Sequence, residues 1–145
     1  MSEFRRDPIT GRWNIVDTDA PMGPGDFSVE SRTPSGSMCP FCAGNERLTP
    51  PEIYAVRPPG SPANGAGWKI RVVSNKFPAL RIEGELNRRG LGLFDLSNGI
   101  GAHEVIIETP DHQKQMADLS VAELEQVLAT FKLRSLDLRG DRRFK

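Results

Sequence analysis

Two cysteines separated by two residues are the clearest candidates for chemistry in this sequence. Cys39 and Cys42 lie in the stretch M-C-P-F-C-A-G-N-E, residues 38–46, and are the 2 cysteines of the chain. Two thiolates at this spacing can face one cation, as at tetrahedral zinc sites, or can form a redox pair. A redox pair usually begins a helix within a βαβ unit, whereas a long Pro-, Gly- and Ser-rich stretch precedes Cys39. The pattern favours a metal site, with redox cysteines and unpaired structural cysteines as the alternatives.

The 2 histidines of the chain are the other candidate ligands, because a structural zinc ion takes four. His103 and His112 are nine residues apart, and a fully extended segment of that length spans roughly 30 Å. Both can therefore bind the same ion only if the chain folds back between them. We expect His103, inside a predicted strand, to make an ordinary hydrogen bond. His112 follows Pro110 beyond the end of that strand, where the sequence fits a ligand and a solvated loop histidine equally well.

Three segments have the composition of β-strands: 12–16, 68–73 and 102–108. In 68–73 the apolar residues alternate with Lys69 and Arg71, so these two cations share the opposite face of the strand. These segments predict a sheet.

One amphipathic helix is expected near the end of the chain. Ser120 and Glu123 form a capping-box pattern, and apolar residues at helical spacing continue over roughly 121–138. The Pro- and Gly-rich segment 18–38 predicts a long loop or arm, and the polar, glycine-bearing segment 81–100 predicts another loop. The predicted fold class is α+β, an antiparallel sheet with a helix packed on one face.

Composition argues against several classes of function. The chain has 145 residues, with 19 basic and 19 acidic side chains. A net charge of zero gives no electrostatic attraction to nucleic acid or to an anionic membrane. No apolar run approaches the roughly 20 residues that span a bilayer, and M-S-E-F-R-R-D at the N-terminus lacks the apolar core of a signal peptide. We expect a cytoplasmic protein with no nucleic-acid or membrane partner.

Five sequence blocks, in order, resemble the N-terminal part of the galactose-1-phosphate uridylyltransferase family, within the histidine-triad superfamily. The blocks are R-R-D-P-I-T-G-R-W-N-I-V at 5–16, C-P-F-C-A-G-N-E at 39–46, T-P-P-E at 49–52, W-K-I-R-V-V-S-N-K-F-P-A-L at 68–80 and G-I-G-A-H-E-V-I-I-E-T-P-D-H at 99–112. Any one block is a modest signal, whereas five in the right order are specific. The resemblance implies a partial histidine-triad-like unit.

The resemblance also implies nucleotidyl transfer in galactose metabolism. In that family a histidine attacks the α-phosphate of UDP-glucose, giving a uridylyl-histidine and glucose 1-phosphate, and galactose 1-phosphate then takes the uridylyl group. The nucleophile is the second histidine of an H-P-H motif, which this sequence lacks. The chain thus resembles an N-terminal nucleotidyltransferase domain, residues 1–145, truncated before the H-x-H motif. It holds no catalytic residue and is expected to be inactive alone, and the complete protein is expected to be a homodimer.

A zinc site is implied by the same resemblance. In zinc-bearing members the CxxC cysteines, the histidine of the P-D-H turn and the first histidine of H-P-H bind the metal. The matching residues are Cys39, Cys42 and His112, whereas His103 is not a ligand in that pattern. The metal would be structural, holding the cysteine turn and the strand end beside the segment of the nucleophile.

Five positions match residues that contact the nucleotide in the family. Asn75 and Lys76 match a pair at a strand tip, and an amide such as that of Asn75 can hydrogen-bond ribose or base edges. Phe41, Val73 and Val105 match positions that line the base. Judged without the family, these three would be ordinary core residues.

One segment departs from the family pattern. Members usually carry arginines in an S-P-x-R-x-x-R-P stretch that contacts the nucleotide phosphates, whereas Asp17–Pro24 has two aspartates and no arginine. Fewer cations weaken diphosphate binding, which leaves adenylyl transfer of the ADP-glucose phosphorylase type, or a noncatalytic zinc-binding module, as alternatives. Truncation would also remove a neighbour from strands 68–73 and 102–108, and an uncovered strand edge predicts aggregation or dimerisation.

Overall fold

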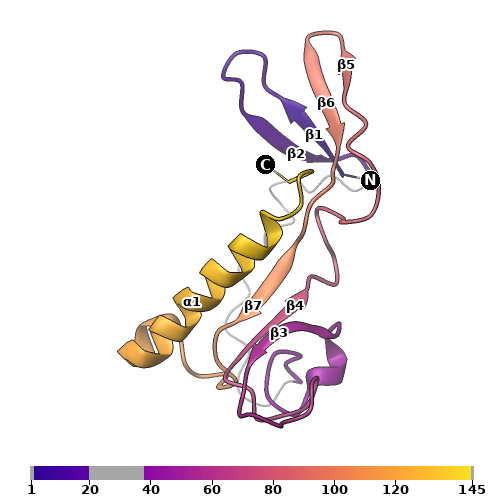
Figure 1. The fold of residues 1–145 in the computed structure, drawn as a ribbon. Coiled ribbons are helices and arrows are strands. Elements are labelled where there is room, and N and C mark those ends of the chain that lie inside the picture. The colour runs from indigo at the N-terminus through magenta and orange to yellow at the C-terminus, as the bar shows by residue number, and fades with distance from the viewer. Residues whose placement is uncertain (1, 20–37, 145) are drawn as a thin grey trace. The chain divides into compact units, whose positions relative to one another are not determined.

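The computed structural model of the chain describes residues 2–19 and 38–144 (Figure 1). The loop or arm expected at 18–38 lies outside these residues except at its two ends. The chain divides into two compact units. The first contains Phe77–His103 with the N-terminal strands and the last residues, and the second contains Glu104–Gly140 with the segment that ends at Lys76. All strand pairings are antiparallel, and the described residues form one α-helix, so the predicted α+β class is confirmed.

The first unit is a four-stranded sheet with the order β2-β1-β6-β5. Its strands are β1 (Ser2–Arg6), β2 (Trp13–Asp17), β5 (Arg89–Leu91) and β6 (Phe94–Asn98). The strand expected at 12–16 is β2, displaced by one residue. A tight turn joins β1 to β2, in which the Asp7 carboxylate accepts hydrogen bonds from the backbone N–H groups of Ile9 and Thr10, at 2.8 and 3.0 Å.

The expectation of a loop over 81–100 is wrong, because this segment contains the β5–β6 hairpin. Leu91 pairs with Phe94 across the hairpin turn, and Gly92 in that turn has φ +59°, a conformation that favours glycine. Most of both strands is exposed, and Leu96 and Ser97 are their buried residues. Their composition is therefore polar, although β6 alternates apolar and polar residues as a strand does.

The second unit is a three-stranded sheet with the order β3-β4-β7. Its elements are β3 (Glu52–Val56), β4 (Ile70–Ser74), β7 (Glu104–Ile107), α1 (Val121–Leu138) and two short 3-10 helices, Glu46–Leu48 and Met116–Asp118. The strands expected at 68–73 and 102–108 correspond to β4 and β7. No strand was predicted at β3.

β4 is the central strand of this sheet, with β3 on one side and β7 on the other. The expectation of an uncovered edge on 68–73 is therefore wrong. Within the part of the chain that the structure describes, β7 pairs on one side with β4, so aggregation or dimerisation stays a prediction that concerns the other edge of β7. Ile70, Arg71, Val72 and Val73 are all at most 2% exposed, so both faces of β4 are covered.

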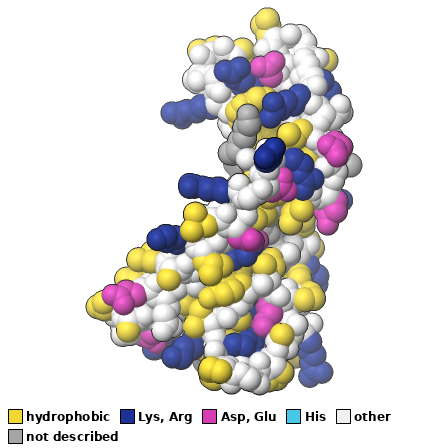
Figure 2. All heavy atoms as spheres, viewed as in Figure 1, with side chains coloured by type: hydrophobic (Ala, Val, Ile, Leu, Met, Phe, Trp, Pro, Cys, Tyr) yellow, Lys and Arg dark blue, Asp and Glu magenta, His cyan; other side chains and the backbone are white. Residues whose placement is uncertain are grey.

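Helix α1 begins where the capping box predicts. The hydroxyl oxygen of Ser120 accepts a hydrogen bond from the Glu123 N–H, and the Glu123 carboxylate accepts one from the Ser120 N–H. The helix runs alongside β7 (Figure 1), and its Arg134 pairs with Glu104 of that strand. Val127 of the helix is fully buried. Hydrophobic side chains also gather on the surface of the helix (Figure 2). Val121, Leu128 and Leu136 of the helix are 76%, 55% and 57% exposed. No helix of the described residues is long and apolar enough to cross a membrane.

Candidate metal centre and nucleotide-binding face

The cysteine segment folds into consecutive turns that bring its two thiols together. The N–H of Cys42 donates to the carbonyl of Cys39 at 3.4 Å, and the N–H of Asn45 donates to the carbonyl of Cys42 at 3.2 Å. The side-chain amide of Asn45 also donates to the Cys39 carbonyl, at 2.8 Å. Gly44 has φ +92°, a backbone conformation that side chains disfavour. Local hydrogen bonds and one glycine thus set the shape of the loop.

His112 reaches the cysteines from the turn that follows β7. The N–H of Asp111 donates to the Thr109 hydroxyl at 3.2 Å, and the Asp111 carboxylate accepts from the Gln113 N–H at 3.0 Å. These bonds shape the turn after Pro110, which ends the extended segment because proline cannot donate to a ladder. The turn places Nδ1 of His112 at 3.4 Å from Sγ of Cys42.

Cys39, Cys42 and His112 form a cluster whose ligand atoms all lie within 4.8 Å of one another. For a tetrahedral zinc ion, Zn–S and Zn–N distances of about 2.3 and 2.0 Å place sulfur and nitrogen roughly 3.5 Å apart. The observed 3.4 Å between Cys42 and His112 is close to that separation. Soft thiolates with one imidazole are also a donor set that zinc prefers, so the cluster fits zinc.

The electrostatics around Cys42 are unlike those of a reactive redox cysteine. Burial raises the pKa of the Cys42 thiol, and the neighbouring Cys39 and the charge of Asp111 raise it further. A reactive redox cysteine needs the opposite shift, toward the thiolate. Two thiols and a carboxylate in one place favour a cation between the thiols instead.

His103 lies one residue before β7 and outside this cluster. Its Nδ1 accepts a hydrogen bond from the backbone N–H of Ala79, at 3.0 Å. It is the ordinary hydrogen-bonded histidine that the sequence predicts, although it precedes the strand. Among the residues the structure describes, no carboxylate completes the cluster as a fourth ligand.

Glu46 is a buried residue near the cysteines that sequence reasoning missed. Its carboxylate accepts hydrogen bonds from Trp68 Nε1 at 2.8 Å and from the Gly44 N–H at 3.0 and 3.1 Å. Burial alone would raise its pKa, but these bonds, with the charge of Arg71 nearby, lower the pKa overall. No periodic pattern links Glu46 to Trp68, because they are 22 residues apart on different elements.

Arg71 extends the polar contacts beneath the cysteine loop. Its side chain is 1% exposed and its Nε donates to the Glu52 carboxylate at 3.2 Å. Its Nη1 donates to the Thr49 hydroxyl at 2.7 Å. Glu52 also accepts from Arg57 at 2.5 Å. Sequence alternation placed Arg71 opposite the apolar residues of its strand, and the structure adds that this face is buried.

The predicted nucleotide residues divide between the sheet and the loops. Val73 and Val105 are direct cross-strand partners of β4 and β7 and belong to one hydrophobic cluster. Val73 is 1% exposed, so its side chain belongs to the core and is not available at the surface of the sheet. Asn75 is half-buried and Lys76 is exposed just beyond β4. Phe41, beside Cys42, is 43% exposed.

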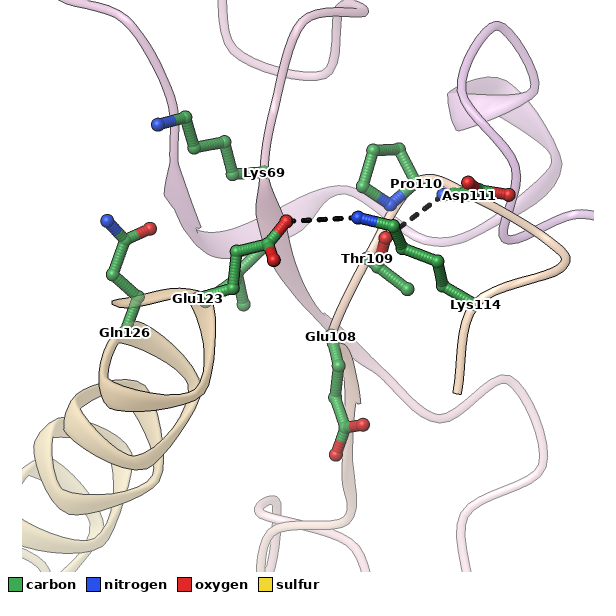
Figure 3. Close-up of a pocket in the computed structure, with 9 residues that line it drawn as sticks. Lys69, Glu108, Thr109, Pro110, Asp111, Lys114, Glu123 and Gln126 are labelled. Atoms are coloured by element: carbon green, nitrogen blue, oxygen red, sulfur yellow. Dashed lines mark hydrogen bonds and ion pairs between the residues drawn. The ribbon is translucent and has the colours of Figure 1, made fainter. Parts of the chain in front are cut away.

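A hollow of about 230 Å³ lies elsewhere in the second unit, between β4, the end of β7 and the start of α1. Figure 3 shows Lys114 reaching across it to Glu123, and these side chains pair at 3.3 Å. None of the predicted nucleotide residues lines it. The hollow shares Asp111 with the histidine turn but gives no separate indication of a substrate.

Antiparallel sheets with one α-helix among the described residues define an α+β fold, and Cys39, Cys42 and His112 form a possible metal site. The family model described as the galactose-1-phosphate uridyl transferase N-terminal domain matches residues 1–144. The chain belongs to this family, so the resemblance drawn from its sequence blocks is confirmed, and its relatives are nucleotidyltransferases.

Curated relatives and solved structures agree with this membership. The chain is 34% identical over 137 residues to ADP-glucose phosphorylase of Arabidopsis thaliana, and 26% identical over 139 residues to galactose-1-phosphate uridylyltransferase of Thermotoga maritima. These matches cover 91% and 95% of this chain but 38% and 36% of the relatives. The chain therefore spans less than two fifths of their length.

The crystal structure of the Arabidopsis thaliana ADP-glucose phosphorylase with bound ADP-glucose matches with a TM-score of 0.59 at 30% identity, covering 99% of this chain and 40% of that one. A uridylyltransferase structure matches with a TM-score of 0.58 at 22% identity, covering 93% and 34%. At that lower identity the likeness supports the fold alone.

Proposed function

We propose that the chain is the N-terminal domain, residues 1–145, of a UDP-glucose:hexose-1-phosphate uridylyltransferase of galactose metabolism. The complete protein would bind UDP-glucose and galactose 1-phosphate in the cytoplasm, as a homodimer. The observation that carries this proposal is the convergence of Cys39, Cys42 and His112 in a chain that matches the family over nearly its whole length. Size-exclusion chromatography with light scattering tests the oligomeric state.

Zinc is the metal we propose for the cluster of Cys39, Cys42 and His112. The bound ion would supply structural cross-linking rather than redox chemistry. The cysteines would hold it as thiolates from the loop, and the imidazole would hold it from the turn after β7. These residues would then fix the loop against the end of the strand.

The nucleotide would lie against the tip of β4. There the Asn75 amide can hydrogen-bond ribose or base edges, and the Lys76 ammonium can pair with phosphate. Val105 and the exposed ring of Phe41 would supply apolar contact for the base. Val73 would contribute indirectly, by packing beneath the residues that contact the base, because its side chain is buried.

Transfer itself would use a uridylyl-histidine in the part of the complete protein that this chain does not cover. Both histidines of the chain already have other roles in the proposal: His103 accepts the Ala79 hydrogen bond, and His112 belongs to the metal cluster. The domain would bind and orient the nucleotide without acting as nucleophile. Incubation with α-phosphate-labelled UDP-glucose should leave the chain unlabelled, and a label on either histidine would overturn this assignment.

Adenylyl transfer is the second candidate. The relative that is 34% identical is an ADP-glucose phosphorylase, and Asp17 and Asp19 stand where family members usually carry phosphate-binding arginines. Either activity would use the same sheet and the same metal cluster, so the base-contacting residues would decide between them.

Calorimetric titration of the purified chain with UDP-glucose and with ADP-glucose tests the proposal. Tighter binding of UDP-glucose, weakened in Asn75→Ala, supports uridylyl transfer. Tighter binding of ADP-glucose, with the same weakening, supports the second candidate. Binding of neither sugar nucleotide, in a folded chain that still holds zinc, would leave a noncatalytic zinc-binding module.

A further inference from the structure

The residues of the metal cluster come from two segments that must be held against each other. Cys39 and Cys42 lie in a loop of turns, whereas His112 follows β7 and is 70 residues from Cys42 in the chain. Hydrogen bonds within the loop set its shape but do not fix its place on the sheet. Some contact between the loop and the sheet must therefore bring the thiols to the histidine.

Glu46 makes that contact. Its carboxylate accepts hydrogen bonds from the Gly44 N–H in the cysteine loop and from the indole N–H of Trp68, two residues before β4. Trp68 is 3% exposed and packs in one cluster with Val73 and Ile107. One carboxylate thus joins the loop to a fixed point of the core.

Among the described residues, few other polar contacts hold the cysteine loop against the strands. Apart from the approach of Cys42 to His112, the side-chain hydrogen bonds that connect 38–49 with the strands come from Trp68 and Arg71. Those of Arg71 end on the Thr49 hydroxyl and on the Glu46 carbonyl, at 2.7 and 3.4 Å. The Glu46 carboxylate is therefore the anchor nearest to the cysteines.

Packing alone does not explain a carboxylate at this position. A buried carboxylate loses hydration and is tolerated when donors satisfy it. Glu46 is 7% exposed, and its donors are one indole and one loop N–H. An aliphatic side chain would fill the space without that cost, but it could not orient Gly44 toward Trp68.

We propose that Glu46 is a positioning residue for the metal centre: through Trp68 it fixes the cysteine loop so that Cys39 and Cys42 meet His112. This inference rests on the metal site of the proposed function. Glu46 does not belong to the cluster of ligand atoms, so it acts through the loop and not by touching the ion.

The test measures zinc binding by the purified chain in competition with a chromophoric chelator, and the absorption of the Co²⁺-substituted chain. Glu46→Gln keeps the size of the side chain, and its amide oxygen can replace the Oε1 that accepts from Trp68 and Gly44, but its amide N–H₂ then faces the Gly44 N–H that Oε2 accepts from. Trp68→Phe keeps most of the packing and removes one donor. Each variant should bind zinc roughly 10- to 100-fold more weakly, as loss of an outer-shell partner does, and should show weaker thiolate-to-cobalt absorption.

Glu104→Gln is the matched control, because it too neutralises a largely buried carboxylate; that of Glu104 is 9% exposed and pairs with Arg134 of α1, away from the cysteine loop. It should lower the melting temperature and leave zinc affinity and the cobalt spectrum unchanged. Wild-type affinity in folded Glu46→Gln and Trp68→Phe would overturn the role of Glu46 and leave the metal site standing. A wild-type chain that binds neither Zn²⁺ nor Co²⁺ would overturn both.

Discussion

The guanidinium of Arg134 on α1 donates two hydrogen bonds, of 2.9 and 2.8 Å, to the carboxylate of Glu104 at the start of β7. The two side chains are 10% and 9% exposed, and Asp137 makes a further contact with Arg134 at 2.9 Å. The Glu104 pair raises the pKa of Arg134. The pair joins α1 to β7.

Arg134→Ala should lower the free energy of unfolding by about 3 kcal/mol, because it leaves a largely buried carboxylate without its partner. Urea unfolding followed by circular dichroism measures the change. Lys114→Ala is the matched control, since the Lys114–Glu123 pair is 39% and 45% exposed and such pairs contribute less than about 1 kcal/mol. Equal losses in the two variants would contradict the role given to the buried pair.

The capping box of α1 predicts a pH dependence. The Glu123 carboxylate accepts from the N–H and the hydroxyl of Ser120, each at 2.8 Å. The bond from the backbone N–H is the largest cause of a pKa lowered from 4.5 to about 2, followed by the hydroxyl and by Lys114. Because the folded-state pKa lies below the ordinary value, the stabilisation is complete above pH 4.5 and is lost as pH falls toward 2.

An NMR titration of the Glu123 side-chain carboxyl checks this value directly. The midpoint should lie near 2 in the wild type and should move toward the ordinary value in Ser120→Ala, which removes the hydroxyl donor. Lys114→Ala should move it less. A wild-type midpoint at the ordinary glutamate value would rule out the capping box in solution.

How much of this fold can be predicted from the sequence depends on whether the signal for each element lies within that element. The bounds of α1 follow from Ser120, Glu123 and the spacing of nearby apolar residues, all within one element. β4 was predictable because its apolar residues alternate. The β5–β6 hairpin was not, because strands that bury little carry a polar composition, and Gly92 alone does not identify a hairpin turn.

The candidate site divides in the same way. Cys39 and Cys42 are visible from their spacing, and His112 from its place in a family pattern, since nothing in its neighbourhood distinguishes a ligand from a loop histidine. The contact between Glu46 and Trp68 could not be predicted from the sequence, because it forms only in the folded sheet. The burial of Val73 likewise depends on the folded sheet, in which it packs in one cluster with Trp68 and Ile107.

The close approach of the backbone where β1 meets β6 predicts that stability is sensitive to substitution of Gly99. A Cβ added to Gly99 would lie 2.5 Å from the backbone carbonyl oxygen of Ser2, to which the Gly99 N–H donates at 3.0 Å. Backbone atoms cannot move aside as a flexible side chain can, so Gly99→Ala should lower the free energy of unfolding by about 1–3 kcal/mol.

Gly90→Ala is the control for that measurement, because a Cβ at Gly90 meets nothing within 4 Å and the residue lies in the neighbouring β5. Chemical denaturation of both variants gives the comparison. Gly90→Ala should change stability by less than about 0.5 kcal/mol. A tolerated Gly99→Ala would show that β1 can shift away from β6.

Metal content is the most direct prediction about the candidate centre. Elemental analysis of the purified chain should find about one zinc per molecule, lost in His112→Ala because removal of one of the three clustered ligands leaves two thiols. His103→Ala is the matched control and should keep the metal, since His103 accepts a hydrogen bond from Ala79 and lies outside the cluster.

Chelation should lower the melting temperature of the wild type and of His103→Ala, and leave that of His112→Ala unchanged, because a bound structural metal stabilises the folded state it binds. Zinc retained in His112→Ala, or lost in both variants, would mean that the three ligand atoms do not hold the ion.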